Sequence, residues 1–226
     1  MDAALTHLIA ACVTFVGTHL VLSHPLRGLL VKAVGDRGFP AVYSLVALAS
    51  FAWMVLAFRA VGPEAPLWNG QSGLAWAVAT VIMLVASVLL VGSFRGNPAM
   101  PAPGAADLAR RGPQGVFLVT RHPMMWAFAL WSAAHVLVNP TPRVIVLAGT
   151  IALLALVGSH LQDRKKAMQM GADWQGWAAR TSYWPRLGGL AKAGVLPWIG
   201  GTVLWLVASW AHGPLIGMAA GLWRGV

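Results

Sequence analysis

The sequence predicts an all-α integral membrane protein, with about six transmembrane helices in one bundle and an interfacial segment before the last helix. Three observations lead to this fold class. Of the 226 residues, 58% are hydrophobic and only 10% are charged, and the mean hydropathy is +0.69. The apolar residues gather in long uncharged runs, and these runs lack the two-residue alternation of a strand. Because lipid offers no partner for backbone N–H and C=O groups, such runs cross a membrane as helices.

The first three predicted spans are residues 3–23, 40–60 and 74–93. The first contains no Lys, Arg, Asp or Glu and has the length of about 20 residues that a span needs. The second begins at Pro40 and stays uncharged to Phe58. The third follows the sequence 67–73, whose Trp, Asn and Gln are typical of the membrane interface.

The last three predicted spans are residues 123–138, 144–161 and 197–212. The fourth starts with Pro123, whose missing N–H costs nothing in a first helical turn, and it ends before Asn139. The fifth ends before a run of four charged residues, and the sixth begins at Pro197. Residues 213–226 form an apolar tail to which the sequence assigns no course. We expect the spans to form a single domain over residues 1–226.

Basic residues alternate between the connections. The first, third and fifth connections hold 13 of the 16 Lys and Arg residues. By the positive-inside rule, these connections lie in the cytoplasm and both termini lie outside. Topology therefore accounts for the net charge of +10, and we expect the lipid bilayer, rather than nucleic acid, as the partner.

The fifth connection, residues 163–192, is the predicted interfacial segment. Four aromatic residues stand among its Lys and Arg residues: Trp174, Trp177, Tyr183 and Trp184. Aromatic and basic side chains next to a span are typical of a segment that lies in the membrane interface.

Few residues could carry chemistry. The six acids all fall outside the predicted spans, which argues against a carboxylate pair or a carboxylate metal site. The single cysteine, Cys12, excludes an intramolecular disulfide and a cysteine-based zinc or iron–sulfur motif. Seven histidines are the remaining candidates.

The predicted direction of each helix sorts six histidines into two tiers. His19, His122 and His160 fall near the cytoplasmic side, and His7, His135 and His212 fall near the outer side. Histidines of separate helices at one depth are what bis-imidazole ligation of haem requires, and neutral imidazole also suits other transition metals. Alternatively, a histidine near a helix end hydrogen-bonds a carbonyl or faces lipid headgroups. Arg121 also has an alternative role, as a charge that snorkels to the boundary.

Three motifs keep their order and spacing over most of the chain. They are Thr120-Arg121-His122-Pro123-Met124, continued by Ala129-Leu130-Trp131-Ser132-Ala133-Ala134-His135 and Asn139; Phe15-Val16-Gly17-Thr18-His19; and Ser159-His160-Leu161-Gln162-Asp163-Arg164-Lys165-Lys166. These motifs resemble the NnrU family of bacterial membrane proteins, which also includes the plant and cyanobacterial cis-zeta-carotene isomerase.

The resemblance implies a haem b-binding protein that is multi-pass in the bacterial inner membrane. The distribution of basic residues places both of its termini on the periplasmic side. Carried over by motif, His19 is the first expected ligand of the haem iron. His122 is the second because it lies at the same depth, and His135 is the main alternative. His160 and Arg121 are further candidates for cofactor binding.

The resemblance leaves several functions open. In the isomerase branch, haem held by two histidines is linked to redox-dependent cis-to-trans isomerisation of a hydrophobic polyene. The bacterial branch is associated with nitrite and nitric oxide reduction, which favours a non-enzymatic haem or electron-transfer accessory protein. A third function is that of an S-adenosylmethionine-dependent membrane methyltransferase, because isoprenylcysteine carboxyl methyltransferases also have Arg-His-Pro at a helix entrance. The fourth is a purely structural role. The sequence identifies neither the substrate nor the oligomeric state.

Overall fold

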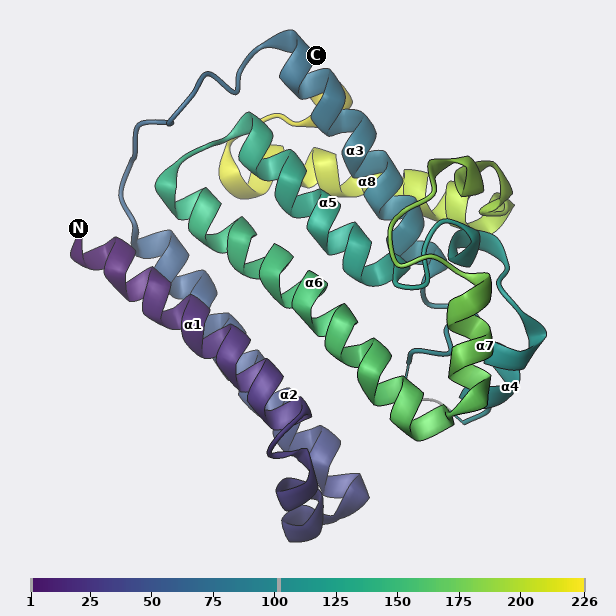
Figure 1. Cartoon of the computed structure of the whole chain (residues 1–226). Helices are drawn as coiled ribbons and strands as arrows, with labels where there is room; N and C mark the ends of the chain where they lie inside the picture. The colour runs from purple at the N-terminus through teal and green to yellow at the C-terminus, as the bar shows by residue number, and fades with distance from the viewer. Residues whose placement is uncertain (1, 101–102, 226) are drawn as a thin grey trace.

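The computed structural model describes residues 2–100 and 103–225, which fold into helices packed side by side (Figure 1). The long helices are α1 (Ala3–Ser23), α2 (Arg27–Ala60), α3 (Gly73–Gly92), α5 (Pro123–Val138), α6 (Pro142–Met170) and α8 (Val195–Ile216). The shorter elements are α4 (Ala105–Arg111), α7 (Ala172–Arg180) and the 3-10 turns η1 (Gly115–Leu118), η2 (Leu187–Lys192) and η3 (Gly221–Gly225). Since the described residues contain no strand, the predicted all-α class is confirmed.

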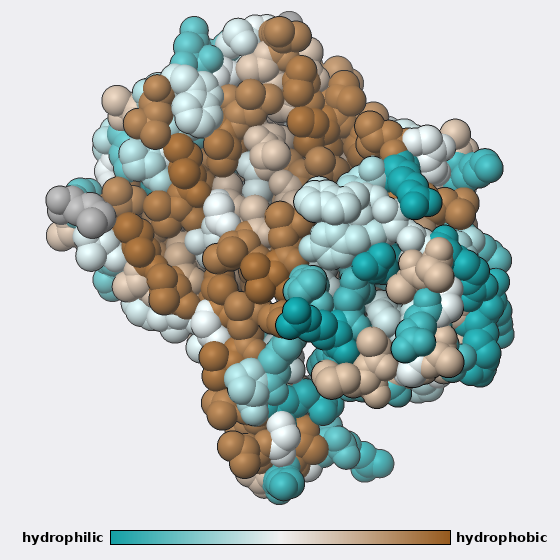
Figure 2. Space-filling model, viewed as in Figure 1, coloured by the Kyte–Doolittle hydropathy of each residue, from teal (hydrophilic) through white to brown (hydrophobic). Residues whose placement is uncertain are grey.

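Five helices, α1, α2, α3, α6 and α8, are long and apolar enough to cross a membrane. The remaining predicted span, the fourth, is α5, which is apolar but has only 16 residues. Large apolar side chains cover the outside of the bundle, such as Leu45 and Leu48 of α2 and Val203 of α8. Figure 2 shows hydrophobic residues over much of the visible face of the long helices. A surface of this kind suits lipid as its solvent, so the chain is a membrane protein.

The long helices pack in the order α2, α1, α6, α5, α3, α8. The pair α1–α2 joins the rest of the bundle through α6 (Figure 1). Helix α3 packs on both α5 and α8, and His135 near the end of α5 and His212 near the end of α8 approach each other beside α3. This arrangement creates two seams, one between α5 and α8 and one between the α1–α2 pair and α6.

Helices α2 and α6 extend furthest beyond their predicted spans. Helix α2 begins at Arg27 and is broken at Gly35, whose φ of 75° glycine adopts without strain. Helix α6 continues beyond its predicted end to Met170, because Ala, Lys, Met and Gln favour a helix in water as well as in lipid. The charged residues 163–166 therefore lie on a continuous rod.

Connections predicted on the same side of the membrane meet at the same end of the bundle. At the end where α1 begins, the Leu67 N–H donates to the Pro140 carbonyl at 2.9 Å, which joins the α2–α3 and α5–α6 connections. At the opposite end, the Gln162 side-chain amide donates to the Ala99 carbonyl at 3.0 Å. The chain thus changes ends with each long helix, as a multi-pass protein requires.

The elements α4, η1, α7 and η2 form a small unit at the end where α1 finishes. Trp174 and Trp177 are buried in its core, and Phe117 packs edge-on against Trp177. Trp184, by contrast, is 67% exposed. Hydrophilic residues gather on the surface at this side of the molecule (Figure 2). The predicted interfacial segment therefore includes tryptophans that stabilise a folded unit rather than contact lipid.

The apolar tail folds back on the bundle. Residues 213–216 complete α8, and the chain then returns along α8 and α3 as far as residue 225; residue 226 lies outside the described residues. Trp223 Nε1 donates to Ser209 Oγ at 3.1 Å, and the Arg224 guanidinium lies 4.3 Å from the ring centroid of Trp76. The tail thus covers the seam between α3 and α8.

We expect Gly201→Ala to weaken the packing of α8 on α3. A Cβ at this position would lie 2.6 Å from Cα of Val88, so the two backbones must separate. Overpacking of this kind costs about 1–3 kcal/mol of unfolding free energy. Thermal unfolding in detergent, followed by tryptophan fluorescence, measures the change. Gly149→Ala on α6 is the control, because its Cβ would meet no atom within 4 Å; equal effects of the two substitutions would contradict the prediction.

Candidate functional site

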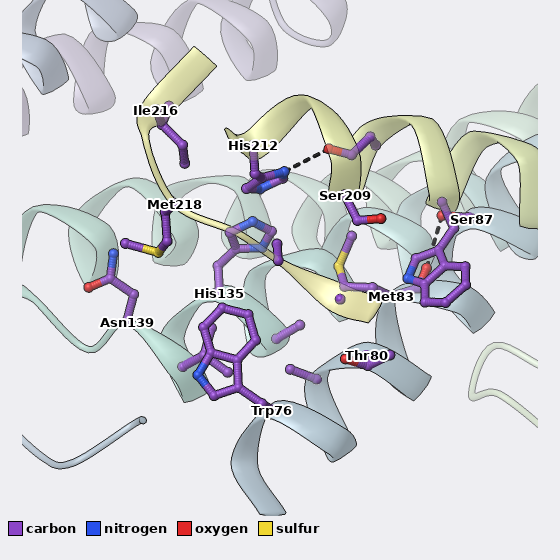
Figure 3. Close-up of a pocket in the computed structure, with 17 residues that line it drawn as sticks. Trp76, Thr80, Met83, Ser87, His135, Asn139, Ser209, His212, Ile216 and Met218 are labelled. Carbon is purple, nitrogen blue, oxygen red and sulfur yellow. Dashed lines mark hydrogen bonds between the residues drawn. The ribbon is translucent and has the colours of Figure 1, made fainter. Parts of the chain in front are cut away.

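Two histidines of different helices face each other at the end of the bundle where α1 begins. The ring centroids of His135 on α5 and His212 on α8 are 6.1 Å apart, and the ring planes are inclined by 30°. Both residues are half-buried. Figure 3 shows the two imidazoles on opposite helices, pointing toward one another in one cavity.

The backbone fixes the tautomer of both rings. His135 Nδ1 lies 2.8 Å from the Trp131 carbonyl oxygen, and His212 Nδ1 lies 2.7 Å from the Ala208 carbonyl oxygen. Because a carbonyl oxygen only accepts hydrogen bonds, Nδ1 carries the proton in each ring. Each Nε2 therefore has a free lone pair, which is the state in which imidazole binds a metal.

The cavity around the pair has a volume of about 130 Å³ and mostly apolar walls. Trp76 and Met83 of α3 and Trp205 of α8 supply its large side chains. Small residues on all sides keep it open: Ala79, Ser87, Ala134, Ala208, Ser209 and Gly221. Asn139 and Met218 stand near His135 (Figure 3). The cavity lies between α3, α5 and α8, all of which contribute residues to its walls.

A second polar cluster lies at the opposite end, around Asp163 of α6. Its Oδ2 accepts from Arg121 Nη2 at 2.6 Å, and its Oδ1 accepts from His122 Nε2 at 2.8 Å. Arg121 Nε lies within 3.0 Å of both carboxylate oxygens. The side chain of His122 is 1% exposed. The cluster therefore fixes the entrance of α5 to the far half of α6.

Tyr183, in the loop after α7, completes this cluster. Its carbonyl accepts from Thr120 Oγ1 and from Trp126 Nε1, both at 2.8 Å. Its ring packs edge-on against His122, with centroids 5.7 Å apart, and the Arg121 guanidinium lies 5.5 Å from the ring centroid. The polar groups of Arg121 and His122 thus hold together the entrance of α5, the helix α6 and the loop after α7.

His19 and His122, the two residues expected first as iron ligands, lie in different surroundings. His19 donates Nδ1–H to the Phe15 carbonyl at 2.7 Å and lines a separate cavity between the α1–α2 pair and the helices α5 and α6. The Nε2 of His122 is occupied by Asp163. His160 is exposed. The imidazoles that the structure brings together are those of His135, the predicted alternative, and His212 of the same tier.

In the described ranges, no three His, Cys, Asp or Glu side chains gather as a metal site. Two imidazoles are nevertheless the complete protein contribution to a bis-histidine haem, because the porphyrin supplies the other four nitrogen donors.

The family described as NnrU protein matches residues 7–220 of this chain. The chain belongs to the NnrU family. No curated protein and no solved structure matches it. The matched range of this NnrU protein includes the histidine pair and the whole Asp163 cluster.

Sequence reasoning missed two residues that organise this NnrU protein. From the sequence, Asp163 is one of four charged residues that follow a span, and Tyr183 is one of the aromatic residues of the predicted interfacial segment. One available signal was that Asp163 is the first charge after the apolar run and the only acid beside three cations. An acid at that depth needs a cationic partner, and Arg121 was the predicted charge at the same depth.

We expect Asp163→Asn to destabilise the protein strongly. The substitution leaves the partly buried Arg121 without its counter-charge, which costs about 2–4 kcal/mol of unfolding free energy. Thermal unfolding of the purified protein in detergent measures the loss. Asp173→Asn is the control, because its partner Arg110 is 56% exposed and solvent already screens that ion pair. A smaller effect at Asp163 than at Asp173 would show that the cluster does not support the fold.

Proposed function

We propose that this NnrU protein binds haem b and that His135 and His212 are the axial ligands of its iron. The separation of the two imidazoles is the observation that carries the proposal. With metal–nitrogen bonds of about 2 Å on opposite sides of the iron, the centroids of two axial imidazoles lie roughly 6 Å apart. The observed value is 6.1 Å.

The hydrogen bonds of the pair support the same function. Ligating histidines donate their other ring N–H to a carbonyl or carboxylate, which orients the ring and raises its basicity. His135 and His212 both do so through carbonyls of their own helices. His122 shows the opposite arrangement, with Nε2 bound to Asp163, and we therefore assign it to structure.

The apolar walls suit a porphyrin, but the volume of the cavity is small. Its volume of about 130 Å³ is below the range of roughly 300–1,000 Å³ that is usual for small-molecule sites. One wall can yield, because Ile216 and Met218 are 64% and 41% exposed and belong to the segment that leaves α8. Binding of haem b therefore requires this segment to move away from α5.

A haem with two protein ligands supplies one-electron transfer. Two histidine ligands are common to the electron-transfer function and to the isomerase, which needs a free position at the iron only after reduction. We propose the electron-transfer function because each imidazole is held in place by a carbonyl of its own helix. The protein would act in the bacterial inner membrane, with the histidine pair toward the periplasmic side, as the distribution of basic residues predicts.

We expect His135→Gly and His212→Gly to lose the low-spin haem spectrum, with haem content reduced by roughly tenfold or more. Absorption spectra of protein expressed with added haem measure this loss. Because a glycine leaves room for the missing ring, free imidazole should restore the low-spin bands, which separates ligand loss from misfolding. His19→Gly and His160→Gly are controls that should keep the spectrum. A loss in His19→Gly with both α5 and α8 variants intact would overturn the assignment.

Reduction of the bound haem tests the choice between the two functions. We expect the ferrous protein to remain low-spin and not to bind carbon monoxide, because two histidines on neighbouring helices hold the iron. Difference spectra before and after carbon monoxide measure this. Rapid formation of a carbon monoxide complex would instead favour the isomerase.

A further inference from the structure

The seam between the α1–α2 pair and α6 contains a cavity that the proposed haem site does not use. Its volume is about 440 Å³, within the range that is usual for small-molecule sites. Its walls are mostly apolar and include Phe15, Phe51, Phe128, Ile151 and Leu154. Residues of α1, α2, α5 and α6 line this cavity, so it lies between the α1–α2 pair and the rest of the bundle, among the apolar helices that the acyl chains of lipid surround.

A basic crevice adjoins this cavity at the end where α1 finishes. The crevice has a volume of about 430 Å³ and is lined by Arg27, Arg164 and Lys165. Ser23, His24 and Lys165 line both spaces, so the apolar cavity and the crevice adjoin at these residues.

The positive charge of the crevice is not neutralised by the protein. Within the described residues, none of the three cations forms an ion pair. The Arg27 guanidinium instead lies 5.2 Å from the ring centroid of Phe39, which holds it at this position. Burial lowers the pKa of His24, and the charge of Lys165 lowers it further. The local field therefore favours an anion.

We propose that the two spaces together bind an anionic membrane phospholipid, with its phosphate headgroup in the crevice and one acyl chain in the apolar cavity. Charge complementarity selects the headgroup, because Lys and Arg beside a membrane attract anionic lipids. The adjoining apolar cavity selects a lipid over a free phosphate, because only a lipid fills both spaces. The site lies between the α1–α2 pair and α6, so the bound lipid contacts both sides of this seam.

Native mass spectrometry of the full-length protein in detergent tests the proposal. The probes are dioleoyl phosphatidylglycerol and, as the neutral comparison, dioleoyl phosphatidylcholine. We expect one phosphatidylglycerol to be retained more strongly than phosphatidylcholine. Arg27→Gln and Lys165→Gln should each weaken its binding by about fivefold. Lys192→Gln, an exposed cation at the same end but outside the crevice, should have no effect.

A second pair of variants tests the place of the acyl chain. Gly158 lines the apolar cavity, and a Cβ there would meet no atom within 4 Å, so Gly158→Leu fills the cavity without a clash at Cβ. We expect it to weaken phosphatidylglycerol binding while leaving the cations intact. Gly149→Leu on the same helix, at an exposed position outside the cavity, is the matched control.

Three results would overturn the proposal. Equal retention of the two lipids, unchanged in all variants, would mean non-specific lipid only. Full competition by inorganic phosphate, with Gly158→Leu unaffected, would mean a phosphate site without a lipid chain. Loss of haem absorbance in Gly158→Leu and in His19→Gly would mean that this cavity holds haem. Phosphatidylglycerol binding in His135→Gly and His212→Gly should be normal. The experiments therefore test the lipid site and the proposed haem site independently of each other.

Discussion

The absence of water from the bilayer interior is the constraint on which this structure depends. Each polar group within a span must find its partner in the protein, since an unpaired group in hydrocarbon costs several kcal/mol. Hydroxyls such as Thr14, Ser87 and Ser132 meet this demand with carbonyls four residues back on their own helices. His135 and His212 satisfy Nδ1 in the same way, with carbonyls four residues back on their own helices. The second nitrogen of His135 and of His212 then faces the same cavity, and a metal between them would satisfy both.

The two ends of the bundle use polar residues differently. At the end with Asp163, every member of the cluster contributes to holding α5, α6 and the loop around Tyr183 together. At the other end, His135 and His212 each bond to a carbonyl of their own helix, so this pair joins no segments. A cluster that joins segments stabilises the fold, whereas an unjoined pair in a cavity retains the capacity to bind. This difference is why we assign the Arg-His-Pro entrance of α5 to structure and the end of α5 to function.

Much of the fold follows from the sequence, because lipid imposes a simple rule of length and hydropathy. Pro123 and Asn139 mark the limits of α5 as they stand in the structure. The rule fails where lipid ends: α6 runs on to Met170, and Trp174 and Trp177 enter a folded core instead of the interface. For the candidate site, depth along each helix places His135 and His212 in one tier. Depth also places His19 with His122, and it cannot distinguish which helices are neighbours.

Sequence by itself determined that this chain is an all-α membrane protein of the NnrU family, how its connections divide between two ends, and which histidines share a depth. Those properties are local, because each depends on the composition and length of one segment. Only the tertiary structure decided that α5 and α8 both pack on α3, that Asp163 pairs with His122, and that the tail returns over Trp76. These outcomes depend on packing between segments distant in the chain, where shape and the pairing of a few charges select one partner among several of equal hydropathy.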